Sequence, residues 1–441
     1  MPYDEAEILR ERSYMMQFKY GLNDRPGWSE MFLLGLQWFA VAIPIIIIIG
    51  KVTGGFHSNN PGDQIVYLQK LTFVMAIALL CQILLGHRLP LIIGPSTVLL
   101  IGIIASQEFD TDTIYSAVLC GGFLLTFLSI TGLFGYLQRL FTMRIVAVVL
   151  LLIAFSLSPT ILNLITVAGT GTTPLMNLLF SLMLTFAMFI LHRILTGVWK
   201  STLIVWAMVL GSLLYFLLVP GSMNMSTFLN VGLVSGFFSH CITKLSFDAG
   251  VMISFLFCYM ALAVNDLGSI QSMNELLKPP DMSRRVTRGM IVTGLANMAS
   301  GFLGVIGPVN YSLSPGVISS TGCASRFVLL PAAFLLLLLS FSPAVIGFIG
   351  NVPPVVIGSV LIYILCAQIA AGLMVVFESE KAFQFNSGLI IALPILLGTI
   401  IAFLPAGIMN TFPTVLKPVL GNGFVVGVVT ALVLEHVIFR K

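Results

Sequence analysis

Long apolar segments recur along the whole chain and limit what it can fold into. The first begins near Met31, and segments of similar length follow at short intervals to the end of the sequence. A helix needs about 20 mostly apolar residues to cross a bilayer. Of the 441 residues, 58% are hydrophobic and only 9% are charged, whereas a soluble domain of this size needs far more charge to cover its surface. The sequence therefore predicts an all-α polytopic membrane protein.

We predict fourteen transmembrane segments in two sets of seven, after a polar cytoplasmic segment at residues 1–30. That segment has no apolar core of the kind found in a secretory signal peptide. The first set covers 31–50, 66–86, 90–106, 113–135, 144–164, 174–192 and 200–219. The second set covers 249–272, 286–305, 308–322, 326–349, 353–375, 386–404 and 418–438.

The distribution of basic residues supports this count. With the N-terminus in the cytoplasm, 17 of the 21 Lys and Arg residues fall on the cytoplasmic side. The exceptions are Lys51, Lys70, Lys244 and Lys417. A missed or extra span would reverse every later loop and remove this bias. Both termini are therefore predicted to be cytoplasmic, in the cell inner (plasma) membrane. Seven spans per half give the halves opposite orientations, the inverted repeat of many secondary transporters.

The third and tenth spans are interrupted at corresponding places in the two halves. Each carries a Gly-Pro pair, Gly94-Pro95 in one and Gly307-Pro308 in the other. Glycine relaxes the backbone and proline removes an amide donor, so neither segment is expected to be a continuous helix. Ordinary proline kinks are the alternative. Broken backbone at membrane depth has to be buried in protein or line a cavity, so we predict a substrate site here. Its predicted residues are Gly94, Ser96, Thr97, Tyr311 and Ser312.

Two further polar features lie inside predicted spans. Asp266 is an acid within the eighth span, and intramembrane carboxylates are costly and usually functional. We predict that it carries the coupling ion; if the span ends earlier, it instead caps a helix or pairs with a basic residue. Gln37 and Trp38 lie in the first span, where Trp38 can stack on a planar ligand or serve only as packing or as an interfacial anchor.

Several classes of function find no support in the sequence. The six cysteines form no C-x-x-C pair, and the five histidines make no pair at helical spacing, so neither a metal nor a cofactor is predicted. No basic run with interleaved aromatic residues indicates nucleic-acid binding. No nucleophile–base pair or phosphate loop indicates an enzyme.

The chain resembles the nucleobase–ascorbate transporters, which include bacterial uracil and xanthine permeases. The resemblance covers nearly the whole length and rests on a set of short motifs. These are Tyr20–Pro26, Leu33–Gln37, Arg288–Met290, Gly294–Ala296, Ser300–Gly304, Gly307-Pro308, Tyr311-Ser312, Pro354–Gly358 and Gly421–Gly423.

The resemblance implies a core domain, a gate domain and a mechanism. The core consists of residues 31–136 (spans 1–4) and 249–350 (spans 8–11). The gate consists of residues 144–219 (spans 5–7) and 353–441 (spans 12–14). Short antiparallel strands are implied in the third and tenth spans. Core movement against the gate would carry a nucleobase with a proton or sodium ion, and the protein would be a homodimer surrounded by membrane lipid.

The substrate signature departs from the family pattern. The first-span Gln-His of the family reads Gln37-Trp38 here, and the glutamate of span eight matches Asn265, with Ser269 at the next polar position. In span ten, Leu313 and Ser314 replace two hydrogen-bonding residues. Leucine cannot accept a hydrogen bond, and two lost partners at roughly 1–3 kcal/mol each weaken a uracil-like site by about one hundred-fold or more.

Three functions follow as hypotheses. The first is a nucleobase symporter with an altered site, in which Asn265 and the backbone at Tyr311 and Ser312 hold the substrate and Asp266 takes the proton. The second is a transporter or exchanger of another solute, such as a small organic or inorganic anion held by paired half-helix N-termini. The third is a membrane scaffold or sensor, which has no need of the broken pair.

Overall fold

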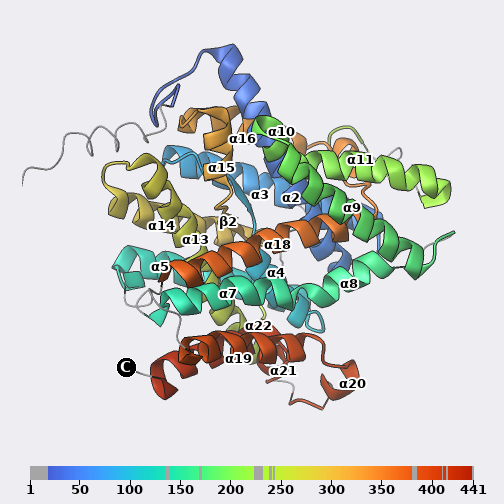
Figure 1. Ribbon diagram of the computed structural model, residues 1–441, viewed down its shortest axis with the longest axis vertical. Coiled ribbons are helices and arrows are strands. Elements are labelled where there is room, and N and C mark those ends of the chain that lie inside the picture. Colours follow the sequence, from blue (N-terminus) through green and yellow to red (C-terminus); the bar gives the residue numbers. More distant parts are fainter. Residues whose placement is uncertain are drawn as a thin grey trace, which may run out of the picture.

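Helices make up most of the chain in the computed structural model (Figure 1), which describes residues 18–135, 140–167, 171–222, 232–237, 241, 244–379, 385–409, 411–413 and 416–439. Within these residues, eight helices are long and apolar enough to cross a membrane, or nine if one bent pair counts as a span. The prediction of a polytopic helical membrane protein is confirmed at this level. The count of fourteen spans and the inverted repeat stay predictions.

The first half of the chain supplies ten helices and one strand among the described residues. They are α2 (Trp28–His57), α3 (Pro61–Leu84), β1 (Ile93–Pro95), α4 (Thr97–Ala105), α5 (Thr111–Thr131), α7 (Met143–Ser156), α8 (Ser158–Thr166), α9 (Pro174–Ile194), α10 (Gly197–Ser201), α11 (Leu203–Leu218) and the short η1 (Pro220–Ser222). The predicted fifth and seventh spans are thus each built from two consecutive helices.

The second half of the chain contains more short helices among its described residues. Its elements are α13 (Ala249–Leu277), α14 (Met282–Leu303), β2 (Pro308–Asn310), α15 (Ser314–Thr321), η3 (Arg326–Val328), α16 (Leu329–Ser340), α17 (Pro343–Ile349), α18 (Pro354–Ser379), α19 (Phe385–Ala402), α20 (Ala406–Met409), α21 (Lys417–Leu420), α22 (Gly423–Val433) and η4 (Leu434–Ile438).

The predicted span 326–349 is not one straight helix. It bends by 105° between Ser340 and Pro343. Proline disfavours helical geometry in the residue before it and suits the first position of a new helix. Ser342 accordingly leaves the helical region, and α17 begins at Pro343.

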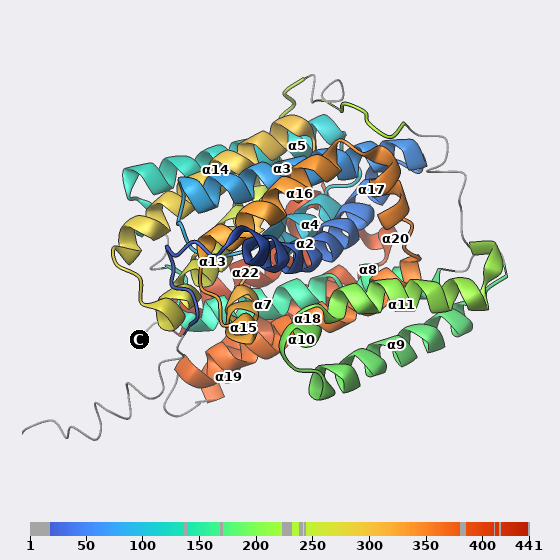
Figure 2. The same cartoon turned by 90° about the horizontal axis from the view of Figure 1, so that it is seen from above.

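The helices pack in two groups, and each group combines segments from both halves of the chain. In one group α14 packs along α5, and α16 packs on α2 and α3. In the other, α18 packs on α7, α8 and α9, while α19 and α22 pack on α7. Figure 2 shows the first group above the second. The groups use the same segments as the predicted core and gate, but a division into moving parts stays a prediction.

Glycine allows α5 and α14 to approach each other closely. A Cβ atom at Gly122 would lie 2.6 Å from the backbone nitrogen of Met298, and one at Gly301 would lie 2.5 Å from the backbone nitrogen of Leu119. Small residues at such a contact let two helix backbones touch, which is the usual source of helix association in a membrane. This contact fixes the position of α14 beside the site described below.

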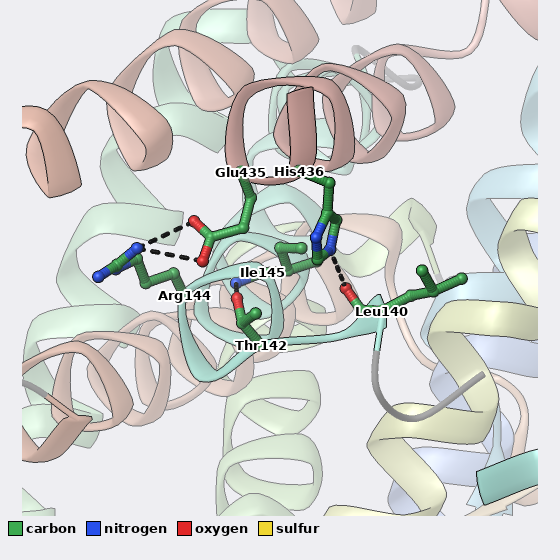
Figure 3. Close-up of polar contacts among 6 residues, drawn as sticks. All are labelled: Leu140, Thr142, Arg144, Ile145, Glu435 and His436. Carbon is green, nitrogen blue, oxygen red and sulfur yellow. Dashed lines mark hydrogen bonds and ion pairs between the residues drawn. The ribbon is translucent and has the colours of Figure 1, made fainter. Parts of the chain in front are cut away.

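The end of the chain is tied to the start of α7. The guanidinium of Arg144 lies 3.1 Å from each carboxylate oxygen of Glu435, which belongs to the π-helix η4 (Figure 3). His436, the next residue, bonds the backbone oxygen of Leu140 through Nε2 at 2.8 Å. The hydroxyl of Thr142 caps α7 by accepting from the backbone nitrogen of Ile145. These contacts join the first and last helices of the second group.

Candidate functional site

The two broken segments meet as a pair of short antiparallel strands. Gly94 of β1 lies opposite Val309 of β2, with Ile93 opposite Asn310 and Pro95 opposite Pro308. The pair is extended by two further bonds, from the backbone nitrogen of Ser96 to the oxygen of Gly307 and from that of Tyr311 to the oxygen of Ile92. The implied strands in the third and tenth spans are confirmed. The extended backbone at this depth is thus satisfied by its own partner strand.

A half-helix begins directly after each strand. Thr97 is the first residue of α4, and the buried Ser96 caps it by accepting from the backbone nitrogen of Leu99. Ser314 opens α15, and its hydroxyl contacts two backbone atoms, accepting from the nitrogen of Ile92 and donating to the oxygen of Tyr311. Both half-helices therefore point their N-termini, the positive ends of their dipoles, toward the strand pair.

The ring of Tyr311 packs closely against Gly94 of the opposite strand. A Cβ atom at Gly94 would lie only 2.2 Å from the ring of Tyr311. The tyrosine hydroxyl donates to the backbone oxygen of Pro95 at 2.6 Å. Only glycine leaves room for this ring, so Gly94 has a steric role in addition to relaxing the backbone.

Asp266 on α13 binds Asn310, the last residue of the second strand. Its Oδ1 accepts from the backbone nitrogen and from Nδ2 of Asn310, both at 2.8 Å. Its Oδ2 accepts from the hydroxyl of Thr293 on α14, also at 2.8 Å. The side chain is fully buried. The predicted carboxylate is therefore inside the protein and is held by three hydrogen-bond donors.

The network continues from Asn310 to a buried histidine. Oδ1 of Asn310 lies 3.1 Å from Nε2 of His87, whose Nδ1 accepts from the backbone nitrogen of Leu89. Because Nδ1 accepts, the neutral ring carries its hydrogen on Nε2 and donates it to Asn310. Burial lowers the pKa of His87 to about 4, which keeps the ring neutral at physiological pH.

Gln82 joins the same network from α3. Its Nε2 donates to the hydroxyl of Thr293 at 3.0 Å and to the backbone oxygen of Gly289 at 2.8 Å. Its Oε1 accepts from the backbone nitrogen of His87. Five side chains from α3, the following turn, α13, α14 and β2 thus form one connected polar unit, and no atom of it remains without a partner among the described residues.

The structure gathers some predicted site residues and separates others. Gly94, Ser96, Thr97, Tyr311 and Ser314 surround the strand pair, and Asp266 reaches it through Asn310. Ser269 is buried and donates back to the oxygen of Asn265 on its own helix. Asn265 is half-buried, whereas Ser312 and Leu313 are exposed.

Gln37 of the first span bonds a residue outside the strand pair, and Trp38 is buried. Nε2 of Gln37 donates to the hydroxyl of Ser201 at the end of α10, 3.2 Å away. Gln37 therefore connects α2 of the first group to a helix that precedes α11. Trp38 is almost completely buried, at 2% exposure. A substrate role for either residue stays a prediction.

Sequence reasoning missed four members of the network: Gln82, His87, Thr293 and Asn310. Gln82 and Thr293 lie within apolar spans, and a buried polar side chain there is a usable signal. His87 and Asn310 gave no such signal because each lies beside a break in the helical pattern. His87 and Asn310 come together only because both segments turn into the interior of the protein.

Comparison with known proteins agrees with the motifs. Residues 29–407 match the model of the xanthine/uracil permeases, described as the Permease family. A putative purine permease, YwdJ of Bacillus subtilis, is 26% identical over 92% of this chain and 96% of its own length. The uric acid transporter UacT of Escherichia coli is 23% identical over 93% of this chain and 86% of its own. A putative purine permease of Clostridium perfringens is 28% identical, but the alignment covers only 42% of that protein and 44% of this chain.

Solved structures of similar fold are anion transporters. The transmembrane domain of the cyanobacterial bicarbonate transporter BicA superposes with a TM-score of 0.63, at 15% identity, over 87% of this chain and 98% of that domain. The inward-facing murine Solute Carrier 26 family member A9 gives a TM-score of 0.61, at 13% identity, over 98% of this chain and 72% of that one. At such identities the likeness describes the fold alone. The family match over most of the chain, together with the paired strands and the motifs, shows that this protein belongs to the xanthine/uracil permease family of nucleobase–ascorbate transporters.

Proposed function

We propose that the protein is a secondary active transporter that moves a purine nucleobase together with a proton. The proposal rests on one observation: the two broken segments meet at one strand pair. A half-helix follows each strand, and the buried Asp266 binds the second strand. Transporters commonly bind substrate where two discontinuous helices of opposite halves meet.

The proposed architecture is the fourteen-span inverted repeat with a core and a gate. Spans 1–4 and 8–11 form the core, which moves against spans 5–7 and 12–14. The termini lie in the cytoplasm, the membrane is the inner (plasma) membrane, and two copies form a dimer. The basic residues of the predicted loops support the orientation, and the two packed groups of helices support the division.

A purine is the preferred substrate class for two reasons. Relatives that align with most of this chain are named as a putative purine permease and a uric acid transporter. The site also offers backbone groups in the exposed turn at Ser312 and Leu313, beside the ring of Tyr311. Backbone donors and acceptors can bind the edge of a planar base without the hydrogen-bonding side chains that Leu313 and Ser314 replace. Asn265, half-buried next to Asp266, supplies one more polar group.

A proton fits Asp266 better than sodium does. An alkali or alkaline-earth cation is bound by several oxygen ligands, whereas the groups around Asp266 are N–H and O–H donors. The two N–H groups on Oδ1 cannot reverse their direction. The hydroxyl of Thr293 can, because it can accept from a protonated Oδ2 and turn its own hydrogen to a helix carbonyl one turn away. We therefore place the coupling proton on Oδ2.

A thermal-shift panel on the detergent-purified protein tests the substrate. Xanthine, uric acid, hypoxanthine and uracil form one arm, and bicarbonate, chloride and sulfate form the other. A ligand at about 100 times its Kd stabilises the folded state by about 2.7 kcal/mol. Stabilisation by purines alone supports the proposal. Stabilisation by anions alone, with none from any base, would overturn it.

An anion transporter is the second candidate, because α4 and α15 both begin at the strand pair and the structural neighbours are named as bicarbonate and anion transporters. Anions bind at helix N-termini through free amide groups and the helix dipole. The two candidates differ in their response to Asp266→Asn. A proton symporter loses uphill uptake, whereas an anion exchanger that relies on helix dipoles keeps its rate.

A further inference from the structure

A cavity of about 600 Å³ opens between α5, α13 and α14, away from the strand pair. The three helices pack against one another, and Figure 2 shows α5 and α14 side by side at one edge of the molecule. The cavity lies between the end of α5, the last turns of α13 and the first turns of α14. Its lining consists of Ser129, Gly132, Phe134, Gly135, Leu267, Gln271, Asn274, Met282, Ser283, Val286, Thr287 and Met290. We call this space the vestibule.

The vestibule is polar at its mouth, and none of the described residues that line it is charged. Gln271, Asn274 and Ser283 are exposed, and within the described part of the chain their side chains form no hydrogen bond. Side-chain amides and hydroxyls at a membrane boundary need water when the protein offers them no partner. At about 30 Å³ per molecule, the volume holds on the order of twenty waters. The vestibule therefore has both the room and the polar groups to hold water.

Along α13 and α14, the vestibule extends inward as far as the level of Asp266. Leu267 lies seven residues before Asn274 on α13, and Met290 lies seven residues after Ser283 on α14. Both helices thus give a depth of about 10 Å at 1.5 Å per residue. Asp266 precedes Leu267, and Thr293 lies one turn beyond Met290. Leu267 and Met290 are buried, at 5% and 1% exposure, and form an apolar floor below the carboxylate network.

The opposite side of the network is closed to water. The space between α3, α14 and β2, lined by Gln82, Thr293 and Asn310 among others, leaves no room for a water molecule. Among the described residues, His87 is the titratable side chain that binds Asn310 in the network, and Arg285 binds the backbone oxygens of His87 and Arg88. Of these two cavities, both lined by described residues, the vestibule is the one with room for water.

We propose that the vestibule is the route by which protons reach Asp266, separate from the path of the substrate, with Met290 as its movable barrier. This inference rests on the proposed proton coupling. Hydronium in the vestibule gives its proton to Oδ2 of Asp266 and remains as water, so no bond other than O–H changes. The unbranched thioether of Met290 has the rotational freedom to open and close the floor.

Thiol accessibility tests the route without any transport assay. Met290→Cys is treated in membranes with a small, charged thiol reagent, and labelling is resolved by peptide mass spectrometry. The native Cys258, fully buried on α13, is the sealed reference within the same molecule. We expect Cys at position 290 to react about tenfold faster than Cys258 or more, because access and thiolate formation limit the rate. Equal, slow reaction of both would overturn the proposal.

A bulky residue at the mouth tests whether this opening is the entrance. Ser283 is exposed, so Ser283→Trp can fold normally, and Leu295→Trp, an exposed position on the same helix, is the matched control. Ser283→Trp should protect Cys at position 290 and slow xanthine uptake driven by a pH gradient, while Leu295→Trp does neither. If Ser283→Trp leaves the labelling unchanged, water enters elsewhere and the route is wrong. If Asp266→Asn still accumulates xanthine, the proposed coupling fails, whereas the labelling result still stands.

Discussion

Asp266 accepts hydrogen bonds from both nitrogens of Asn310, the backbone nitrogen and Nδ2, each at 2.8 Å. One carboxylate oxygen thus fixes both the main chain and the side chain of the last strand residue before the second half-helix. The other oxygen binds the hydroxyl of Thr293. Any change in the charge of Asp266 therefore acts on α14 and on the broken tenth span at the same time.

Asn310→Ala should destabilise the protein strongly. The change removes the Nδ2 donor of Asp266 and the acceptor of His87, and each buried group left without a partner costs roughly 1–3 kcal/mol. We expect a loss of about 2–5 kcal/mol, read as a lower Tm in detergent. Asn163→Ala, at an exposed position on α8, is the control and should stay within about 0.5 kcal/mol. Equal Tm values for both variants would contradict the network.

Asp266→Asn should abolish accumulation against a gradient while leaving exchange. An amide cannot carry the proton, and its NH₂ group would face donors that now bind a carboxylate. One proton per neutral solute supports about tenfold accumulation per pH unit, and the variant should show none in proteoliposomes. Asp248→Asn is the control on the same helix, because asparagine can still cap α13 as Asp248 does through Val251. Accumulation by the Asp266 variant at the native level would rule out this coupling residue.

Gly94→Ala should displace Tyr311 and weaken the strand pair. The added methyl would lie 2.2 Å from the tyrosine ring, and the ring cannot move without losing its bond to Pro95. Overpacking of this kind typically costs about 1–3 kcal/mol. Gly316→Ala on α15 meets nothing within 4 Å and should be neutral or slightly stabilising. The comparison is a pair of Tm measurements, and an unaffected Gly94 variant would show that the ring adapts freely.

Protonation of His87 in acid should lower the free energy of unfolding. Its folded-state pKa of about 4 lies below the ordinary value of 6.5, so the unfolded chain binds the proton more readily. The stabilisation that neutral His87 provides is complete above about pH 6.5 and is lost as the pH falls toward 4. The loss is on the order of 3 kcal/mol at most. His87→Gln should lower Tm at neutral pH but flatten its decline below pH 6.5. A decline as steep as that of the native protein would exclude His87 as its source.

The sequence predicted the polytopic helical architecture and the two broken segments. Apolar length identified a polytopic protein because a bilayer demands it, and two Gly-Pro pairs marked the broken segments because those residues disrupt a helix wherever they occur. Asp266 stood out for the same kind of reason, since a carboxylate in an apolar span is costly in any fold. Each of these inferences depends on a local rule that operates along a single segment.

The tertiary structure decided which groups meet. The partner of Asp266 is Asn310, 44 residues later, and the partner of Asn310 is His87, 223 residues earlier. No periodicity encodes such pairs, because hydrogen bonds between distant segments depend on how the halves pack. The bend at Ser340 and the vestibule between α5, α13 and α14 arise in the same way. The sequence determined where the chain must break, and packing determined what the broken ends bind.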